Sequence, residues 1–370
     1  MYIEKCHVDL NMIKIVTVIG ARPQFIKAAP VSRAISREAG LHEVIIHTGQ
    51  HFDENMSQVF FDQMQLSRAS HMLDIHSLPH GAMTGRMMEA IEGILMQEAP
   101  DWVMVYGDTN STLAGALAAS KLHIPVAHVE AGLRSFNMHM PEEINRILTD
   151  RLSHWLFCPT PVAVDNLTRE GYEHFPAKMI LTGDVMYDAS LMFRDKATRP
   201  AGVDLDKPFI LCTIHRAENT DDPARLDGLI DAVNTLSEER GVIFPMHPRT
   251  RKMLGKSRLN SLSKGIQVTE PLGYLEILYL LQHCELVMTD SGGMQKEAYF
   301  FNKACITLRD ETEWTELVDA GYNRVCGSDA KNIIHHFHHF TENPPAFAEG
   351  LYGKGNASAI IAKAFLDQNT

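Results

Sequence analysis

The chain has 370 residues, of which 45% are hydrophobic and 22% are charged, and this composition is typical of a globular protein. Its formal net charge of -12 argues against a nucleic-acid-binding protein, because such proteins usually present a basic surface. The length exceeds what one ordinary hydrophobic core holds, so we predict two domains.

The amino-terminal segment 1–11 contains Glu4, Lys5 and Asp9 and lacks an apolar core, so we do not expect a secretory signal. No apolar run approaches the ~20 residues that cross a bilayer. The cysteines are scattered without a Cys-x-x-Cys pair, which indicates reduced thiols in a cytoplasmic protein. They are Cys6, Cys158, Cys212, Cys284, Cys305 and Cys326.

Short apolar runs alternate with segments of helical length in the first half of the chain. Continuous apolar strands are what a parallel sheet covered on both faces requires. The predicted strands are Ile13–Ile19, Val44–His47, Trp102–Tyr106, Val126–Val129, Leu156–Cys158 and Met179–Leu181. We therefore expect a doubly wound, Rossmann-like α/β domain over residues 12–190.

The same alternation returns after Arg194–Pro208, a segment whose Pro200, Gly202 and Pro208 mark it as a linker. The later strands are predicted at Phe209–Ile214, Val242–Met246, Ile266–Val268, Leu286–Met288 and Ala304–Leu308. We expect a second Rossmann-like domain over residues 205–352. Ligands of such folds bind at the carboxyl ends of the strands, and we expect a cleft between the two domains.

Two cations follow the first predicted strand. Arg22 lies in a Gly-Ala-Arg-Pro turn, and Lys27 lies about one helical turn later. A pair of cations there could neutralise a diphosphate leaving group. The alternative is solvated surface charge, which is the usual role of a lysine.

Acids follow later strands of the first domain. Asp108 ends an apolar strand and could N-cap a helix that begins near Ser111, a structural role that is compatible with catalysis. Glu130 ends the next strand. Glu142 and its neighbour Glu143 lie in the first turn of a helix, where the helix dipole favours acids. On spacing alone, a structural role is favoured for both Glu130 and Glu142.

Histidines and glycines follow the strands of the second domain. His215 and His247 are either satisfied histidines at the edge of the core or donors to a phosphate or sugar hydroxyl. The segment Ser291-Gly292-Gly293 opens a predicted helix, where backbone N–H groups favour a phosphate. A simple N-cap with a tight turn is the alternative. Glu297 lies one turn later, where it could accept hydrogen bonds from a ribose diol, so we predict a nucleotide diphosphate site.

Other motifs exclude further chemistry. His335, His338 and His339 have a spacing that could bind zinc, but no acid or cysteine lies near them, so we predict no metal site. The motifs GxGxxG and GxxxxGK[ST] are absent, so we expect neither a dinucleotide cofactor nor a P-loop.

Taken together, the strand exits resemble those of the non-hydrolysing UDP-N-acetylglucosamine 2-epimerase family. The resemblance runs in order from about residue 13 to the end of the chain. The matching segments are Ala-Arg-Pro-Gln-Phe-Ile-Lys (21–27), Gly-Asp-Thr (107–109), His-Val-Glu-Ala-Gly-Leu-Arg (128–134), Pro-Glu-Glu-Ile-Asn-Arg (141–146), His-Arg-Ala-Glu-Asn (215–219), Thr-Asp-Ser-Gly-Gly-Met-Gln-Lys-Glu (289–297) and Tyr-Gly-Lys-Gly-Asn-Ala-Ser (352–358).

The resemblance implies the glycosyltransferase-B fold, with UDP in the cleft and a last helix, within 353–370, that packs back on the first domain. It also implies a homodimer, a UDP-sugar substrate and no cofactor. The family reaction inverts C2 by elimination of UDP to a 2-acetamidoglucal and re-addition on the other face, and it serves the synthesis of cell-surface polysaccharide precursors.

The resemblance also assigns roles to the candidate residues. The acid/base groups would be Asp108, Glu130 and Glu142, with His215 assisting proton transfer or contacting the phosphates; UDP or substrate would be bound by Arg22, Lys27, His247, Ser291, Gly292, Gly293 and Glu297.

Departures from the common family pattern resemble a second branch, the UDP-2,3-diacetamido-2,3-dideoxyglucuronate 2-epimerases. Gln24 and Lys296 stand where many UDP-N-acetylglucosamine epimerases have Glu, and Trp314 stands where they commonly have Arg. Fewer acids near the substrate would suit a sugar with a C6 carboxylate. The absence of the arginine removes a positive charge, which would not suit such a sugar. The segment 107–122 also resembles that branch.

Some bacterial relatives bind an activating second UDP-N-acetylglucosamine through a Gln-His-Arg segment. Here residues 50–52 read Gln-His-Phe, so the resemblance does not extend to that site. Two other functions remain open. A glycosyltransferase of the same fold would leave the three acids unexplained. A catalytically inactive UDP-sugar sensor would have lost an acid or His215, and the chain retains all of them.

Overall fold

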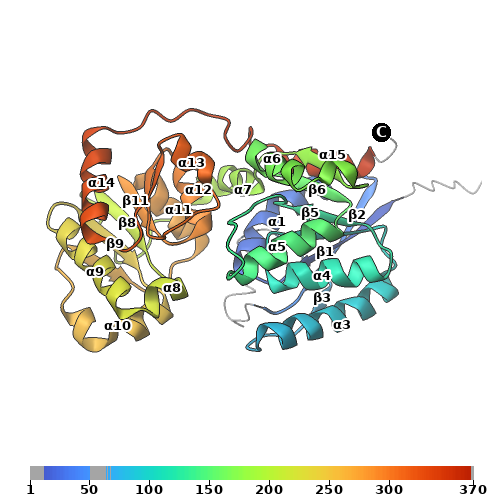
Figure 1. Cartoon of the computed structure of the whole chain (residues 1–370), viewed down its shortest axis with the longest axis horizontal. Helices are drawn as coiled ribbons and strands as arrows, with labels where there is room; N and C mark the ends of the chain where they lie inside the picture. Colours follow the sequence, from blue (N-terminus) through green and yellow to red (C-terminus); the bar gives the residue numbers. More distant parts are fainter. Residues whose placement is uncertain (1–11, 51–63, 65, 67, 368–370) are drawn as a thin grey trace, which may run out of the picture. The chain divides into compact units, whose positions relative to one another are not determined.

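The computed structural model describes residues 12–50, 64, 66 and 68–367. Within these residues the chain forms two compact α/β units (Figure 1). One unit runs to Ala189 and resumes at Tyr352, and the other comprises Ser190–Leu351. Both contain a parallel sheet with helices on its two faces, which confirms the predicted pair of Rossmann-like domains.

In its described part, the first unit has a seven-stranded sheet in the order β3-β2-β1-β4-β5-β6-β7. Its strands are β1 (Ile13–Ile19), β2 (Leu41–His47), β3 (His71–Met72), β4 (Trp102–Tyr106), β5 (Val126–Val129), β6 (Trp155–Cys158) and β7 (Lys178–Leu181). Its helices are α1 (Arg22–Ile35), α3 (His80–Glu98), α4 (Asn110–Lys121), α5 (Pro141–Leu152), α6 (Pro161–Arg169), α15 (Ala357–Leu366) and the short η1 (Tyr172–His174), while α7 (Val185–Phe193) leads into the second unit.

The second unit, which is described throughout, has a six-stranded parallel sheet in the order β10-β9-β8-β11-β12-β13. Its strands are β8 (Phe209–Thr213), β9 (Gly241–Pro245), β10 (Ile266–Thr269), β11 (Leu286–Thr289), β12 (Ala304–Thr307) and β13 (Asn323–Val325). Its helices are the short η2 (Arg194–Lys196), α8 (Ala217–Thr220), α9 (Pro223–Ser237), α10 (Pro248–Asn260), α11 (Tyr274–His283), α12 (Gly292–Phe300), α13 (Thr315–Asp319) and α14 (Ala330–Glu342).

Every predicted strand is present, with small shifts at the ends. The sequence missed β3 and β13, which are two and three residues long and close one edge of each sheet. Neither has a continuous apolar run, because an edge strand is covered on fewer sides than a central one. The predicted linker, Arg194–Pro208, contains no strand and only the short η2.

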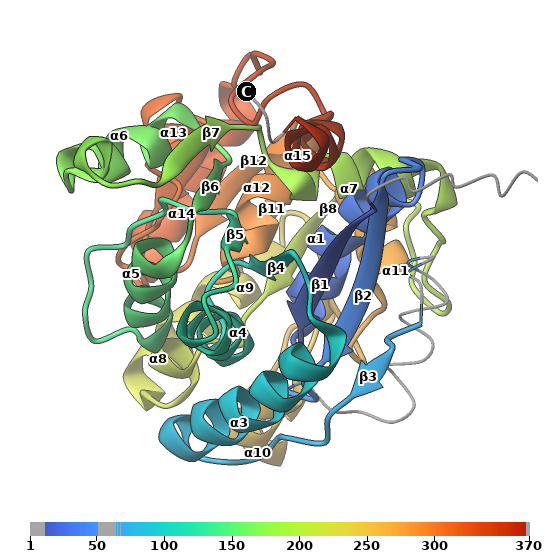
Figure 2. The ribbon, with the colours of Figure 1, turned by 90° about the vertical axis from the view of Figure 1, so that its right-hand side faces the viewer.

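Helix α4 packs very closely on the first sheet, with α3 and α5 beside it (Figure 2). Its small residues are almost all buried. A Cβ on Gly115 would lie 3.1 Å from a methyl of Val105 and 3.2 Å from Val18, so glycine permits this approach. The packing fixes the amino-terminal end of α4, which directly follows the strand exit that carries Asp108.

The carboxyl-terminal helix α15 packs on α1 in the first unit. The ring of Phe365 lies 5.6 Å from that of Trp102 and 5.2 Å from that of Trp155. The carboxylate of Asp188 accepts hydrogen bonds from the backbone N–H groups of Ala357 and Ser358, at 3.1 and 2.8 Å, and so caps the start of the helix.

Within residues 12–50 and 68–367, none of the helices combines the length and the apolar character that a membrane span requires. The cysteines of the described residues are free and buried. Cys6 and the predicted absence of a signal in segment 1–11 lie outside the described residues.

Candidate active site

The candidate residues gather where the strand order of each sheet reverses. In the first unit the order reverses between β1 and β4, and in the second between β8 and β11. At such a point the connections leave toward opposite faces of the sheet, so the carboxyl ends of the two strands border a crevice where ligands of doubly wound folds bind. Arg22 and Asp108 follow β1 and β4, and His215 and Ser291 follow β8 and β11.

Glu130 follows β5 in a backbone conformation that side chains rarely adopt, with φ at +71°. Its side chain is 7% exposed, and its Oε2 lies 2.6 Å from Nζ of Lys27 in α1. A Cβ on Gly107 would lie 3.3 Å from the same Nζ, so the glycine leaves room for the lysine. A glutamate held in this way costs on the order of 1–3 kcal/mol of backbone strain, which is typical of functional sites.

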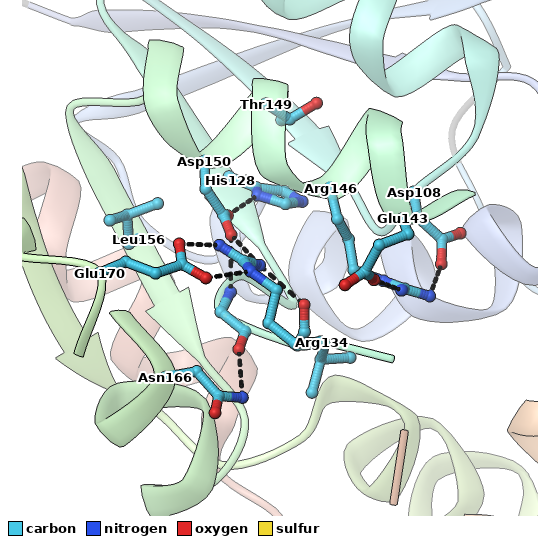
Figure 3. Close-up of polar contacts among 12 residues, drawn as sticks. Asp108, His128, Arg134, Glu143, Arg146, Thr149, Asp150, Leu156, Asn166 and Glu170 are labelled. Atoms are coloured by element: carbon cyan, nitrogen blue, oxygen red, sulfur yellow. Dashed lines mark hydrogen bonds and ion pairs between the residues drawn. The ribbon is translucent and has the colours of Figure 1, made fainter. Parts of the chain in front are cut away.

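Asp108 follows β4, and its carboxylate is held by Arg146 of α5, with 2.6 Å between Oδ2 and Nη2 (Figure 3). The side chain of Asn145 donates to the backbone carbonyl of Asp108 at 2.9 Å. The N-capping role predicted for Asp108 is wrong, because Thr109 is the N-cap of α4 and accepts from the N–H of Thr112. The carboxylate of Asp108 is 28% exposed and is therefore accessible.

The two neighbouring glutamates of α5 have different environments. Glu143 is 1% exposed, pairs with Arg146, and accepts from the backbone N–H groups of Ser135 and Phe136 at 3.0 and 2.9 Å. Glu142 is partly exposed and forms no hydrogen bond or ion pair with any residue that the structure describes. Glu143 is thus held in place by the fold, and Glu142 is the partly exposed acid of the two.

Arg22 is the first residue of α1 and is partly exposed. Two residues later, Gln24 is 1% exposed and uses both ends of its amide. Its Oε1 accepts from the N–H groups of Gly20 and Ala21 at 2.8 and 3.0 Å, and its Nε2 donates to the carbonyl of Tyr106 at 2.8 Å. The uncharged Gln24 therefore joins the exits of β1 and β4 inside the first unit.

In the second unit, Asp290 organises the exit of β8. Its buried carboxylate accepts from the backbone N–H groups of His215 and Arg216, both at 2.9 Å, and from the side chain of Asn219 at 3.1 Å. Nδ1 of His215 lies 3.0 Å from its Oδ1. Burial opposes ionisation of Asp290, but these hydrogen bonds outweigh it and hold the pKa of the carboxyl below its ordinary value.

His215 is 39% exposed, and the bond to Asp290 fixes Nδ1 as a donor. Nε2 is then the nitrogen that can exchange a proton or donate to a phosphate. The ring of His247 lies 5.8 Å away. Burial, followed by the charges of His215 and Arg249, lowers the pKa of His247, and its Nδ1 accepts from the N–H of Arg249 as the N-cap of α10.

The Ser-Gly-Gly segment forms the start of α12. Ser291 is its N-cap and accepts from the N–H of Met294. A side chain on Gly292 would overlap the carboxylate of Glu313, so packing requires the first glycine. A Cβ on Gly293 would meet nothing within 4 Å, so the backbone there is open to a ligand. Glu297, one turn later, is 6% exposed.

Two of the predicted departures from the family pattern touch each other. Nζ of Lys296 lies 4.0 Å from the centre of the Trp314 ring, and the two residues are 1% and 3% exposed. A cation over an aromatic face is a favourable contact. Together they form one buried pair.

Sequence reasoning missed Asp290, Asn145 and Arg146 as residues of the site. Asn145 and Arg146 lay inside a matching motif, but only the fold shows that they contact Asp108. Asp290 also lay inside a matching motif, next to the Ser-Gly-Gly segment, but only the fold shows that it holds the exit of β8.

Among the described residues, no cluster of three or more His, Cys, Asp or Glu side chains could hold a metal ion. In the histidine-rich helix α14, His338 contacts Glu239 at 3.1 Å. Gln50 accepts from the hydroxyl of Ser111 at 2.7 Å, and residues 51–53, where an activator segment was considered, lie outside the described residues.

Comparisons with known proteins identify the family of the chain. A family model described as UDP-N-acetylglucosamine 2-epimerase matches residues 33–366. The UDP-2,3-diacetamido-2,3-dideoxy-D-glucuronate 2-epimerase of Pseudomonas aeruginosa is 55% identical, over 95% of this chain and 98% of that protein.

Solved structures extend the likeness to three dimensions. The UDP-GlcNAc 2-epimerase of Methanocaldococcus jannaschii, in complex with UDP-GlcNAc and UDP, matches with a TM-score of 0.89 and 40% identity, over 96% of this chain and 100% of that chain. The enzyme of Neisseria meningitidis bound to UDP-GlcNAc matches with a TM-score of 0.88 and 32% identity, over 96% and 100% of the two chains. These matches confirm the predicted glycosyltransferase-B fold class.

Proposed function

The chain belongs to the UDP-N-acetylglucosamine 2-epimerase family and is an isomerase, and from this premise we propose that it inverts C2 of a UDP-linked 2-acetamido sugar by eliminating and re-adding UDP. Two carboxylates carry the proposal. Asp108 and Glu130 follow the adjacent strands β4 and β5, and each is oriented by a cation from a helix. Paired, oriented carboxylates are suited to moving a proton at carbon.

The proposed reaction has two steps. A base removes the C2 proton while the C1–O bond to the diphosphate breaks, so UDP leaves with the bonding electrons and a C1–C2 double bond forms. UDP then adds back to C1, and an acid returns a proton to C2 from the opposite face. The steps balance without an oxidant or reductant, and inversion requires proton-carrying groups on both faces.

The first unit supplies the groups that move protons in this proposal. Asp108, Glu130 and Glu142 form the acid/base set. Arg146 orients Asp108. Lys27 orients Glu130, because its Nζ lies 2.6 Å from the carboxylate, so its role is not limited to binding the diphosphate. Salt bridges of this kind hold a carboxylate in one orientation, and an oriented group reaches the reactive geometry at a lower cost in entropy.

The remaining residues bind UDP in the proposal. The backbone N–H groups at the start of α12, from Ser291 to Gly293, hold the diphosphate, which the open space beside Gly293 supports. Glu297 accepts from the ribose. His215 and His247 contact the phosphates through a nitrogen, and Arg22 supplies positive charge for the leaving diphosphate.

For the sugar, we propose UDP-2,3-diacetamido-2,3-dideoxy-D-glucuronate, with UDP-N-acetylglucosamine as the second candidate. The relative named for the diacetamido sugar is 55% identical to this chain, whereas the two solved UDP-GlcNAc 2-epimerases are 40% and 32% identical. We further propose a role in supplying precursors of cell-surface polysaccharide.

The test is incubation with each nucleotide sugar in D2O, followed by NMR at C2. We expect deuterium at C2 and two epimers with the diacetamido-glucuronate nucleotide, and slower exchange with UDP-N-acetylglucosamine. The opposite order would assign the second candidate as substrate. No exchange with either nucleotide would refute the epimerase proposal.

A homodimer and a cytoplasmic location are also proposals. The dimer is inferred from the family resemblance and is tested by light scattering of the purified chain, where a monomer mass would refute it. The location is supported by the free, buried cysteines of the described residues, which suit a reducing compartment. Fractionation of the source cells tests it.

A further inference from the structure

His128 lies in β5 with its side chain fully buried, and both of its ring nitrogens face hydrogen-bond acceptors. Nδ1 lies 2.7 Å from Oδ1 of Asp150 (Figure 3). Nε2 lies 2.7 Å from the carbonyl oxygen of Gly107. A carbonyl and a carboxylate can only accept, so both nitrogens must donate. With Asp150 ionised, both contacts are hydrogen bonds only when the ring carries a proton on each nitrogen, as a positively charged imidazolium.

The surrounding charges make a buried cation feasible. Oδ2 of Asp150 accepts from Nη1 of Arg134 at 2.7 Å, and Arg134 reaches both carboxylate oxygens of Glu170 at 2.7 and 2.8 Å (Figure 3). Two cations thus face two anions, and a buried charge is tolerated when it is paired and hydrogen-bonded in this way. Burial opposes ionisation of Asp150, but its bonds to His128 and Arg134 hold the pKa of the carboxyl below its ordinary value.

The ring of His128 connects the two strand exits that carry the proposed acids. Gly107 directly precedes Asp108 at the end of β4, and His128 lies two residues before Glu130 in β5. The N–H of Gly107 donates to the carbonyl of Val129 at 3.0 Å, so its peptide groups are held on both sides. Gly107 and Glu130 both have positive φ, at +61° and +71°, and a chain that turns this sharply needs such fixation to keep one conformation.

Helix α5 holds the other side of the same turn. Asn145 and Arg146 bond the carbonyl and the carboxylate of Asp108, and Asp150 lies one turn further along the helix. One helix therefore fixes Asp108 directly, and it also fixes the residue before Asp108 through the charged ring of His128.

We propose that His128 is a positioning residue whose charged ring, balanced by Asp150, holds the Gly107 carbonyl and so aims the carboxylate of Asp108 relative to Glu130. The inference rests on the proposed function, because the roles of the two acids come from it. It predicts that Asp150, which has no contact with Asp108, is needed for full turnover.

The charge of the ring is tested on the unaltered chain. Nitrogen-15 NMR of the histidine rings near neutral pH should show one ring with protons on both nitrogens and slow solvent exchange. That signal should disappear in His128→Gln, which identifies it. A neutral ring at His128 would overturn the proposal, and this measurement needs no variant that must keep its activity.

The positioning role is tested by Asp150→Asn, which keeps the size of the side chain and removes its charge. We expect turnover of C2 exchange to fall on the order of 100-fold, the usual cost of a misplaced reacting group, with KM and UDP binding nearly unchanged. The imidazolium signal should be lost with it. A merely structural role would lower the amount of folded protein and leave turnover per folded molecule intact, which would refute the proposal.

A matched control is His71→Gln. His71 also pairs with a carboxylate, Glu98, at 2.8 Å in the same unit, but it joins β3 to the end of α3 and touches neither proposed acid. Its turnover should equal that of the unaltered chain. If the unaltered chain shows no C2 exchange, the proposed function fails and the positioning role fails with it. If it exchanges and Asp150→Asn exchanges equally fast, the positioning role alone fails.

Discussion

Each proposed acid that follows a strand of the first unit is held by a specific basic side chain. Lys27 was predicted to contact a diphosphate, yet its Nζ lies on Glu130, and Arg146, which was not predicted as a site residue, holds Asp108. Glu142 has no such partner among the described residues. The three acids are therefore not equivalent: two are fixed in direction, and one is free to move.

Asp108→Asn keeps the shape of the side chain and removes its ability to carry a proton. We expect C2 exchange to fall by about 100-fold or more, because one acid/base group contributes about that factor. UDP binding should persist, since Asp108 is not among the proposed UDP contacts, and calorimetry with UDP measures it. Asp101→Asn, at the opposite end of β4, is the matched control with unchanged exchange. Full activity of Asp108→Asn would remove Asp108 from the acid/base set.

At the scale of the elements, α5 has the reverse of the burial pattern of an ordinary surface helix. Its buried residues include Glu143, Arg146 and Asp150, whereas Ile144 and Leu148 are 39% and 44% exposed. A helix normally buries its apolar stripe and exposes its charges. The buried charges of α5 are paired with the strand exits, so the helix contributes a polar network to the site at the expense of ordinary hydrophobic packing.

The pair between α12 and the segment before α13 gives a second prediction. Lys296→Glu would place an anion against the face of Trp314, and Trp314→Arg would place a second cation beside Lys296. The double variant restores opposite charges, so we expect it to recover part of the stability lost in each single variant, with a coupling of about 1–2 kcal/mol. Urea unfolding of all four proteins measures the cycle.

The same variants test whether Lys296 and Trp314 influence the choice between the two nucleotide sugars. We expect the preference between the two nucleotide sugars to stay the same in the double variant, because the pair is buried. A changed preference would show instead that Lys296 and Trp314 select the substrate.

At the scale of the whole molecule, the two units share one feature at the carboxyl ends of their central strands. In each sheet the strand order reverses between two strands, and a buried side chain joins the exits of those strands. Gln24 bonds the carbonyl of Tyr106 in the first unit, and Asp290 bonds the N–H of His215 in the second. These bonds fix the edges of both crevices without a ligand, which reduces the ordering that binding requires.

The pH dependence of folding provides the third prediction. Burial lowers the pKa of His47 from 6.5 to about 4, and its ring stacks on Phe25 with 5.0 Å between centroids. The unfolded chain takes up a proton at a higher pH than the folded one, so the stabilisation is complete above pH 6.5 and declines as the pH falls toward 4. The loss amounts to about 3 kcal/mol.

Denaturant unfolding across that pH range tests this contribution. In His47→Gln the decline should be smaller than in the unaltered chain by that amount. His42→Gln, on the same strand but exposed, should leave the decline unchanged. Equal slopes in all three proteins would show that His47 does not titrate as expected.

The apolar pattern along the chain was enough to predict the two parallel sheets, because uninterrupted apolar runs are stable only when both faces of a sheet are covered. It also placed Asp108, Glu130, His215 and Ser291 at strand exits. It could not show the partners of these residues, since Lys27 and Glu130 are 103 positions apart in the chain (130 − 27) and meet only in the folded first unit.

The packing of the elements sets which polar residues face the site and which hold it in place, and this could be seen only in the folded structure. Glu142 and Glu143 are adjacent and identical in type, yet the turn of α5 exposes one and buries the other against Arg146. Gln24 and Lys296, whose charges differ from the common family pattern, are both buried among partners of the fold, which the sequence could not show. The physical reason is that spacing along a chain fixes the local direction of a side chain, whereas its partner is set by packing between elements far apart in sequence.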